Sequence, residues 1–150
     1  MRAYFRTMAL EFLSPLHKAS RQITMYLEDQ TRALGVSPLE GHVLTYLRKY
    51  APAPVGELVR VFGIKQSTLT SLLDRLERSG LARREPNPAD RRSFLISLTE
   101  RGRDLTTRLN RLLEKLEDDI RARLRRAEAK GFHAVMAAVE DVTQVQVRER

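Results

Sequence analysis

The chain has 150 residues, of which 42% are hydrophobic, and this is enough for one domain around a single core. It has no cysteine, which excludes structural disulfides, and no apolar run approaches the roughly 18 residues of a membrane-spanning helix. The first residues also lack an uninterrupted apolar signal region, so we expect a cytoplasmic protein with no membrane contact. Lys and Arg number 27 against 19 Asp and Glu, and this excess favours a polyanionic partner.

The N-terminal segment has the apolar spacing of one long helix over residues 4–34, and Gly35 is suited to end it. The apolar residues that recur at near-helical spacing are Met8, Phe12, Leu16, Ile23 and Leu27. Pro15 interrupts this pattern. We therefore expect a kink or a break near it, or a helix that starts just before it.

Residues 37–40 mark the start of a second helix. Ser37 suits the N-cap, Pro38 the first helical position, and Glu40 closes a capping box. The helix cannot continue through residues 51–54, where Ala and Pro alternate, so these residues are predicted to form an extended connector.

The next stretch has the pattern of a helix-turn-helix. Residues 57–62 read as a short helix that Gly63 can end, because glycine adopts a positive φ at low cost. A second helix is predicted over residues 66–78. Its Leu69, Leu72, Leu73 and Leu76 collect on one face, while Gln66, Ser67, Thr70, Ser71, Asp74 and Arg78 occupy the other. A tight turn at residues 63–64 between two helices is what the motif requires.

A β-hairpin is predicted to follow the second helix. Ser79 and Gly80 stop the helix, and residues 94–98 then alternate as a strand does. Residues 81–85 are the partner strand, and residues 86–92 form the loop. This hairpin, the wing, places Arg83, Arg84, Arg91 and Arg92 beside Glu85 and Asp90.

The C-terminal third is predicted to form two further helices. Thr99 suits the N-cap of a long helix whose apolar stripe runs along Leu105, Leu109, Leu112, Leu116, Ile120 and Leu124. A last helix is predicted after Gly131, with Phe132, Val135, Val139 and Val142 on its apolar side. Such a stripe needs a partner, which is either a second copy of the chain or, in a monomeric bundle, these helices folded back on each other.

Three runs of residues resemble the MarR family of bacterial transcriptional regulators. They are Leu76-Glu77-Arg78-Ser79-Gly80-Leu81-Ala82-Arg83-Arg84, Asp90-Arg91-Arg92 and Leu98-Thr99-Glu100-Arg101-Gly102. The resemblance implies one domain over residues 1–150, mainly α with a small β-hairpin wing (α+β). Its winged helix-turn-helix would span residues 37–102, and dimerisation helices would lie in residues 1–35 and 103–150.

The resemblance also implies a homodimer and a set of DNA contacts. We expect the dimer to be held by apolar side chains of the terminal helices: Phe12, Leu16, Leu109, Leu112, Leu116, Ile120, Phe132, Val135 and Val139. The DNA-binding residues are predicted to be Lys65, Gln66, Ser67, Thr70, Ser71, Arg75, Asp90, Arg91 and Arg92. Short polar side chains on the first turns suit a helix that enters the major groove, Arg75 would lie at the groove edge, and Arg92, oriented by Asp90, would be the wing arginine.

Two positions depart from the usual family pattern. Lys65 stands where a Ser or Asp type of N-cap is common, and Ser71 stands where a longer polar side chain is common. Both departures shift the expected base readout toward Thr70 and Arg75.

The function that these features predict is sequence-specific transcriptional regulation. We expect a repressor that binds a pseudo-palindromic operator in double-stranded DNA as a homodimer, with half-sites roughly 34–36 Å apart. By resemblance, a small aromatic or phenolic ligand would bind between the first, second and fifth helices and relieve repression. The alternative is a winged helix used for protein contact alone.

Enzyme chemistry has little support in the sequence. There is no glycine-rich phosphate loop, nucleophile elbow or metal-ligand motif, so no cofactor and no catalytic residue are predicted. His17, His42 and His133 fall on three separate predicted helices and are interpreted as ordinary histidines, with no metal site.

Overall fold

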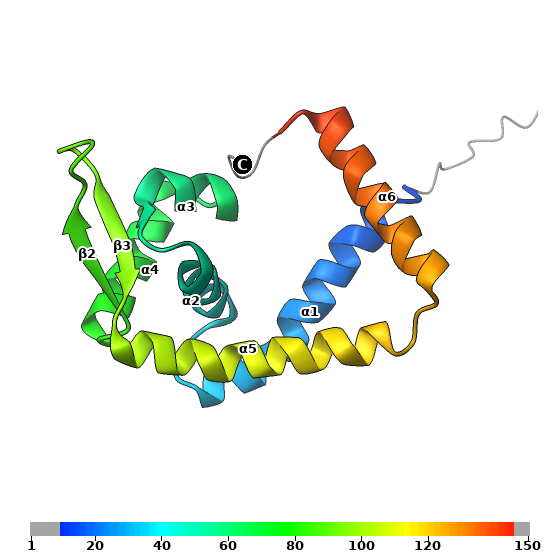
Figure 1. Cartoon of the computed structure of the whole chain (residues 1–150), viewed down its shortest axis with the longest axis horizontal. Helices are drawn as coiled ribbons and strands as arrows, with labels where there is room; N and C mark the ends of the chain where they lie inside the picture. Colours follow the sequence, from blue (N-terminus) through cyan, green and yellow to red (C-terminus); the bar gives the residue numbers. More distant parts are fainter. Residues whose placement is uncertain (1–9, 146–150) are drawn as a thin grey trace, which may run out of the picture.

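The computed structural model describes residues 10–145, which form a mainly helical fold with one small sheet (Figure 1). In chain order the elements are α1 (Leu13–Ala33), α2 (Pro38–Tyr50), β1 (Ala53–Pro54), α3 (Val55–Phe62), α4 (Gln66–Arg78), β2 (Ala82–Pro86), β3 (Phe94–Leu98), α5 (Glu100–Arg121) and α6 (Arg126–Thr143). The predicted fold class, mainly α with a small β wing, is confirmed. Within the described range, no helix is both long enough and apolar enough to cross a membrane.

The first helix is shorter than the predicted one. It begins at Leu13, two residues before Pro15, and residues 10–12 are not helical, while residues 4–9 of the prediction lie outside the described range. A proline in the first turn costs little because its missing N–H would have no partner within the helix there. Of the alternatives at Pro15, the start just before it is therefore confirmed. Gly35 follows the helix with a φ of 78°.

The capping box at the start of α2 is formed as predicted. The Ser37 hydroxyl accepts from the Glu40 amide at 3.2 Å, and the Glu40 carboxylate accepts from the Ser37 amide at 2.8 Å. Two N–H groups of the first turn are satisfied in this way.

The sheet has three strands, one more than the predicted hairpin. The strand order is β1-β3-β2, and both pairings are antiparallel. The predicted connector at residues 51–54 supplies β1, where Ala53 pairs with Ile96. An extended Ala-Pro segment is compatible with a short edge strand, because proline only has to avoid a position where its N–H is needed.

One core joins the sheet to α2, α3, α4 and the first part of α5. Its buried residues are Val36, Val43, Leu44, Leu47, Ala53, Leu58, Leu69, Leu72, Leu73, Leu76, Leu81, Ala82, Ile96, Leu98, Leu105 and Leu109. Gly63 ends α3 with a φ of 59°, and α4 begins three residues later. The predicted helix-turn-helix is therefore formed, and all four leucines of α4 lie in this core.

The two C-terminal helices differ from prediction at their ends. α5 stops at Arg121, so Leu124 lies in the connection to α6 and not on the helical stripe. α6 begins at Arg126 and passes through Gly131, although its start was predicted after that glycine. Glu128 explains the earlier start, because its carboxylate accepts from the Arg125 amide at 2.8 Å and caps the helix.

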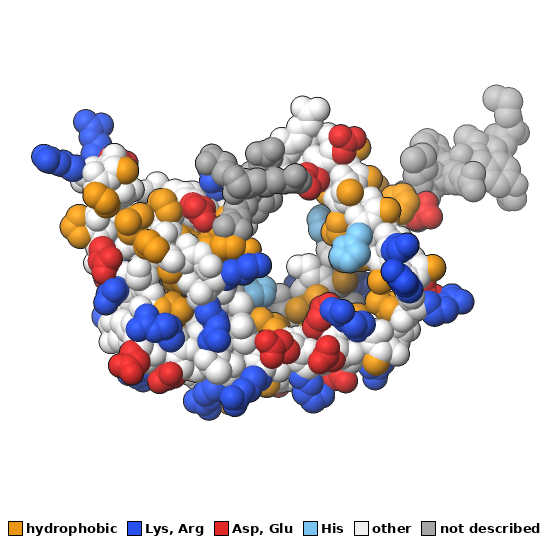
Figure 2. All heavy atoms as spheres, in the orientation of Figure 1, with side chains coloured by type: hydrophobic (Ala, Val, Ile, Leu, Met, Phe, Trp, Pro, Cys, Tyr) orange, Lys and Arg blue, Asp and Glu red, His pale blue; other side chains and the backbone are white. Residues whose placement is uncertain are grey.

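The terminal helices α1 and α6 lie largely away from the winged-helix part of the molecule. In Figure 1, α5 extends from the sheet and α2–α4 at one end to α1 and α6 at the other. Figure 2 shows an open space between the winged-helix part and α6. No residue of α6 is buried, and only Leu27 and Thr31 of α1 are. These two helices thus pack far less within the chain than the winged-helix part does.

Candidate nucleic-acid interface

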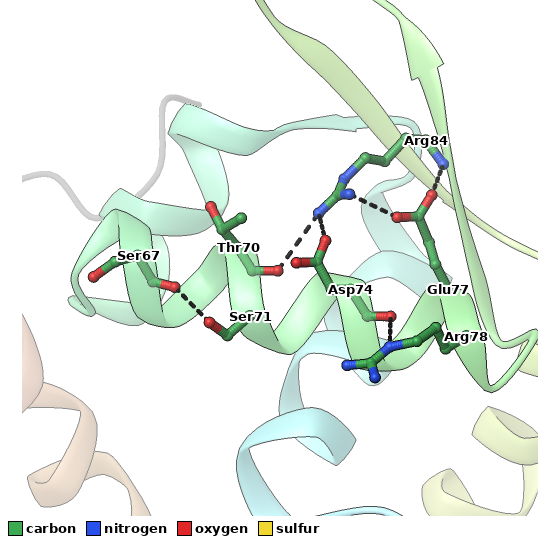
Figure 3. Close-up of polar contacts among 7 residues, drawn as sticks. All are labelled: Ser67, Thr70, Ser71, Asp74, Glu77, Arg78 and Arg84. Atoms are coloured by element: carbon green, nitrogen blue, oxygen red, sulfur yellow. Dashed lines mark hydrogen bonds and ion pairs between the residues drawn. The ribbon is translucent and has the colours of Figure 1, made fainter.

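The exposed face of α4 carries the residues that were predicted to read DNA. Gln66, Ser67, Thr70 and Ser71 are all exposed, and the leucines on the other face are buried. The Ser71 hydroxyl donates to the Ser67 carbonyl at 3.1 Å, so its proton is already used (Figure 3). Gln66, Ser67 and Thr70 keep donors and acceptors available to a ligand in the major groove.

Lys65 occupies the N-cap position of α4. Its side chain makes no capping hydrogen bond, so the first N–H groups of this 13-residue helix have no side-chain cap. The positive end of the helix and the lysine charge lie together here, which favours an anion such as a phosphate.

Arg75 lies one turn beyond Ser71 on α4 and bonds to a different helix. Its Nε donates to Glu40 Oε1 on α2 at 2.8 Å. Burial raises the pKa of Glu40, but hydrogen bonds from Ser37 and the charge and hydrogen bond of Arg75 outweigh it, and the net pKa lies below the usual 4.5. Arg75 therefore has a structural partner that the sequence analysis did not assign to it.

The wing loop is shaped by its own side chains. Asn87 Oδ1 accepts from the Ala89 amide and Asp90 Oδ1 from the Arg92 amide, both at 3.0 Å. Asn87 also donates to the Ser93 hydroxyl at 2.9 Å. These bonds close the loop between β2 and β3, as Asx turns do.

Asp90 was predicted to orient the Arg92 side chain, and the structure gives it a different contact. Its carboxylate holds the Arg92 backbone, and within residues 10–145 neither Arg91 nor Arg92 makes an ion pair. Both arginines are exposed, and basic side chains project from the wing tip in Figure 2. The tip is thus a pair of uncompensated cations on an ordered loop, which suits contact with phosphates or a narrow minor groove.

Arg84 connects the wing to α4, and the sequence analysis missed this role (Figure 3). From β2 its guanidinium reaches Asp74 Oδ1 and Glu77 Oε2, each at 2.7 Å. Glu77 also accepts from the Arg84 backbone amide at 3.2 Å. The signal was present, because Asp74 and Glu77 are three residues apart on one helix face and successive strand residues point to opposite faces. We call these three residues the Arg84 bridge.

A second junction fixes the base of the wing. The Thr99 hydroxyl donates to the Gly80 carbonyl at 2.7 Å and accepts from the Gly102 amide at 3.0 Å, and the Thr99 amide donates to the Leu81 carbonyl at 3.1 Å. A Cβ on Gly102 would lie 2.0 Å from the Leu81 carbonyl oxygen. The run from Leu98 to Gly102 therefore joins the end of α4, the start of the wing and the first turn of α5.

The predicted dimerisation residues divide by exposure in the single chain. Phe12, Ile120 and Phe132 are exposed although they are large and apolar. Leu16, Leu112, Leu116, Val135 and Val139 are half-buried. Leu109 is only 3% exposed and already belongs to the core of the chain, so it has little surface left for a partner.

The predicted ligand region is closely packed. Between α1, α2 and α5 a cavity of about 10 Å³ is lined by residues that include Leu27, Thr31, Gly41 and Leu109. Across residues 10–145 no group of three His, Cys, Asp or Glu side chains could hold a metal ion. His17, His42 and His133 lie on α1, α2 and α6.

A helix-turn-helix with an exposed polar second helix and an arginine-tipped wing defines the class of winged helix-turn-helix transcriptional regulators. The profile of the MarR family matches residues 34–93. Over 132 residues the chain is 34% identical to the HTH-type transcriptional regulator PecS of Dickeya dadantii, covering 85% of this chain and 79% of that protein. The chain belongs to the MarR family of transcriptional regulators and is not an enzyme.

One further match in sequence and one in fold are consistent with this assignment. The HTH-type transcriptional repressor NicR of Pseudomonas putida is 29% identical over 87 residues, which are 58% of this chain and 55% of that protein. The fold matches that of S. aureus MepR in its crystal structure with DNA, at a TM-score of 0.77 and 19% identity, covering 87% of this chain and 97% of that chain.

Proposed function

We propose that this regulator binds a pseudo-palindromic DNA operator as a homodimer and represses transcription from it. The observation that carries the proposal is the exposed polar face of α4 beside a wing whose tip holds Arg91 and Arg92, which make no ion pair with any described residue. A helix of this kind fits the major groove, and a basic hairpin tip fits the flanking backbone or minor groove. The crystal structure of the similar MepR with DNA supports the same use of the fold.

Base readout is assigned to Gln66, Ser67 and Thr70. Their polar groups are exposed at the N-terminal half of α4, whereas Ser71 donates to Ser67 and Arg75 is bonded to Glu40. We therefore place Arg75 at the groove edge, where its remaining N–H groups face solvent, and Thr70 at the centre of the readout.

The homodimer is proposed from the terminal helices. No residue of α6 is buried in the described part of the chain, and large apolar side chains are exposed at Phe132 on α6 and Ile120 on α5. Exposed apolar surface of this kind marks an interface, and a second copy supplies a matching surface through two-fold symmetry. The two recognition helices would then reach successive major grooves, roughly 34–36 Å apart.

Relief of repression by a small aromatic or phenolic ligand is proposed by family resemblance. The region between α1, α2 and α5 holds a cavity of only about 10 Å³, so an aromatic ring would have to displace the side chains that line it. Such a ligand can change the affinity for the operator only by as much as its own affinity for the opened arrangement exceeds that for the closed one.

Selection of DNA from a random pool tests the proposal. We expect an enriched pseudo-palindrome with half-site centres about 10 base pairs apart. Thr70→Ala and Gln66→Ala should change the preferred bases, by about 1–3 kcal/mol for each lost base contact. Thr24→Ala, which removes an exposed hydroxyl from α1, is the matched control and should leave the preference unchanged. A pool without enrichment would instead favour the protein-contact alternative.

A further inference from the structure

We propose that Arg84 is a positioning residue that sets the wing at a fixed angle to the recognition helix α4, acting through Asp74 and Glu77. The effect on DNA affinity rests on the proposed function, whereas the contacts of Arg84 with α4 are present in the protein alone. Arg84 itself is not assigned to DNA.

The contacts of Arg84 cross from one element to another. Its two terminal nitrogens each meet a different carboxylate of α4 at 2.7 Å, and the carboxylate of Glu77 also holds the Arg84 backbone amide. The guanidinium lies near the Thr70 carbonyl as well, at 3.5 Å (Figure 3). Paired, charge-assisted bonds of this kind fix direction as well as distance. The side chain is 25% exposed, so water screens it less than it screens a surface pair.

On β2 the bridge is the last polar link to the rest of the protein before the tip, while β3 is held as far as Leu95 by its pairing with β1. Beyond Arg84, the hydrogen bonds and ion pairs of residues 85–94 that the structure describes stay within β2, β3 and their loop. The direction of the free arm that carries Arg91 and Arg92 is therefore set on one strand by the Arg84 bridge and on the other by the pairing of β3 with β1. A wing without the bridge would be held by the β1 pairing alone, so the hairpin would move more freely and the hydrogen bonds of its loop would open more often.

The neighbouring Arg83 provides an internal comparison. It lies on the opposite face of the same strand, its side chain is 60% exposed, and its ion pair is with Glu85 of β2 itself, at 2.9 Å. Arg83 and Arg84 thus carry the same charge at nearly the same place, but only Arg84 reaches α4. Any effect that comes from charge alone should be shared by both, and an effect of positioning should belong to Arg84.

The first test needs no DNA. Hydrogen exchange of the backbone amides of Asn87 and of residues 89–93 is compared in the full-length wild type, Arg84→Gln and Arg83→Gln. We expect at least about threefold faster exchange in Arg84→Gln and wild-type rates in Arg83→Gln. Equal rates in all three proteins would overturn the proposal, whether or not the protein binds DNA.

The second test measures coupling to the wing tip on the selected operator. Arg92→Ala should lower affinity by about tenfold in wild type and in the Arg83→Gln background. In the Arg84→Gln background the same change should cost less than about twofold, because a misdirected tip has little contact left to lose. An equal cost in both backgrounds would overturn the proposal. If Arg92→Ala has no effect even in wild type, the proposed wing contact with DNA fails, and the exchange experiment alone decides the bridge.

Two additional variants separate positioning from other roles. Removing Arg84 leaves the carboxylates of Asp74 and Glu77 without their cation. The triple variant Asp74→Asn, Glu77→Gln and Arg84→Gln removes the bridge without leaving these unpaired negative charges. We expect this triple variant to show the same fast exchange and the same loss of coupling as Arg84→Gln. Recovery of wild-type behaviour would mean that Arg84 only shields the carboxylates, against the proposal. Should Arg84→Gln not fold, Arg84→Lys keeps the charge but not the two-point contact, and it should show the same changes to a smaller extent.

Discussion

Glu40 and Arg75 join the start of α2 to the recognition helix through a contact of 2.8 Å between Oε1 and Nε. The other oxygen of the same carboxylate accepts from the Ser37 amide and completes the capping box. The Glu40 side chain is 11% exposed and that of Arg75 is 51% exposed. One nearly buried carboxylate thus caps α2 and also bonds to α4, whose leucines lie in the core.

The pH dependence of stability should report on Glu40. Its pKa in the folded protein lies below the usual 4.5, so its contribution is present above about pH 4.5 and is lost as the pH falls through the folded value. We expect Glu40→Gln to lower the free energy of unfolding by about 1–2 kcal/mol at pH 7 and by much less near pH 3. Denaturant unfolding at fixed protein concentration measures this. Glu114→Gln, at an exposed position of α5, is the control and should change stability little at either pH. A difference that persists unchanged at low pH would contradict the assignment.

Replacement of Gly102 should damage the fold more than replacement of another helical glycine. A Cβ there would lie 2.0 Å from the Leu81 carbonyl oxygen, and a backbone atom cannot rotate away. We expect Gly102→Ala to cost at least about 2 kcal/mol in thermal or denaturant unfolding. Gly56→Ala in α3 is the matched control, because nothing lies within 4 Å of its added Cβ. It should be neutral or stabilise by up to about 1 kcal/mol. Similar effects of the two changes would mean that α5 does not approach Leu81 so closely.

A charge on α6 should separate the proposed dimer. Phe132 is 54% exposed in the single chain, and an aspartate buried there by a partner would be an unpaired carboxylate in each protomer. Phe132→Asp is expected to raise the dimer dissociation constant by about 100-fold or more, as measured by sedimentation. Phe94→Asp makes the same change at a 49% exposed position on the wing and should leave the dimer intact. If both variants sediment as the wild type does, α6 is not at the interface.

Loss of Arg92 should change the salt dependence of DNA binding. If each of the two wings neutralises one phosphate through Arg92, Arg92→Ala should flatten the slope of log K against log salt by about 1.8, at roughly 0.9 for each contact. Thermal stability should stay within about 0.5 kcal/mol, since the side chain is exposed and makes no ion pair within the described residues. Asp90→Ala removes the acceptor for the Arg92 amide and should weaken binding with a smaller change in slope. Wild-type affinity and slope in Arg92→Ala would show that the wing tip does not contact DNA.

The features that the sequence predicted well are those with local causes. The capping box of Ser37 and Glu40 and the N-cap at Thr99 depend on residues within one turn of each other, and both are formed. The turn at Gly63 and the apolar face of α4 likewise follow from neighbouring residues. Local signals of this kind are readable because the side chain and the backbone group that it satisfies are close in sequence.

The features that the sequence did not predict depend on distant partners. β1 is two residues long and exists because Ala53 meets Ile96, more than forty positions away. The pairing of Glu40 with Arg75 also required knowledge of how two helices pack. The start of α6 was predicted wrongly because Gly131 was interpreted as a position where the helix could not continue. A helix-interior glycine costs only about 1 kcal/mol relative to alanine, and the cap at Glu128 can offset that.

Because Gly102 packs closely against Leu81, a tilt of α5 must also move the base of the wing. The helix has 22 residues and is roughly 33 Å long, and its first turn is fixed to the base of the wing and the end of α4. A tilt of about 5° around its far end would move that first turn by about 3 Å. This displacement is close to the rise of roughly 3.4 Å between successive bases of a DNA strand. A small change in packing at the far end of α5 would therefore displace the wing and α4 by a distance close to one base step.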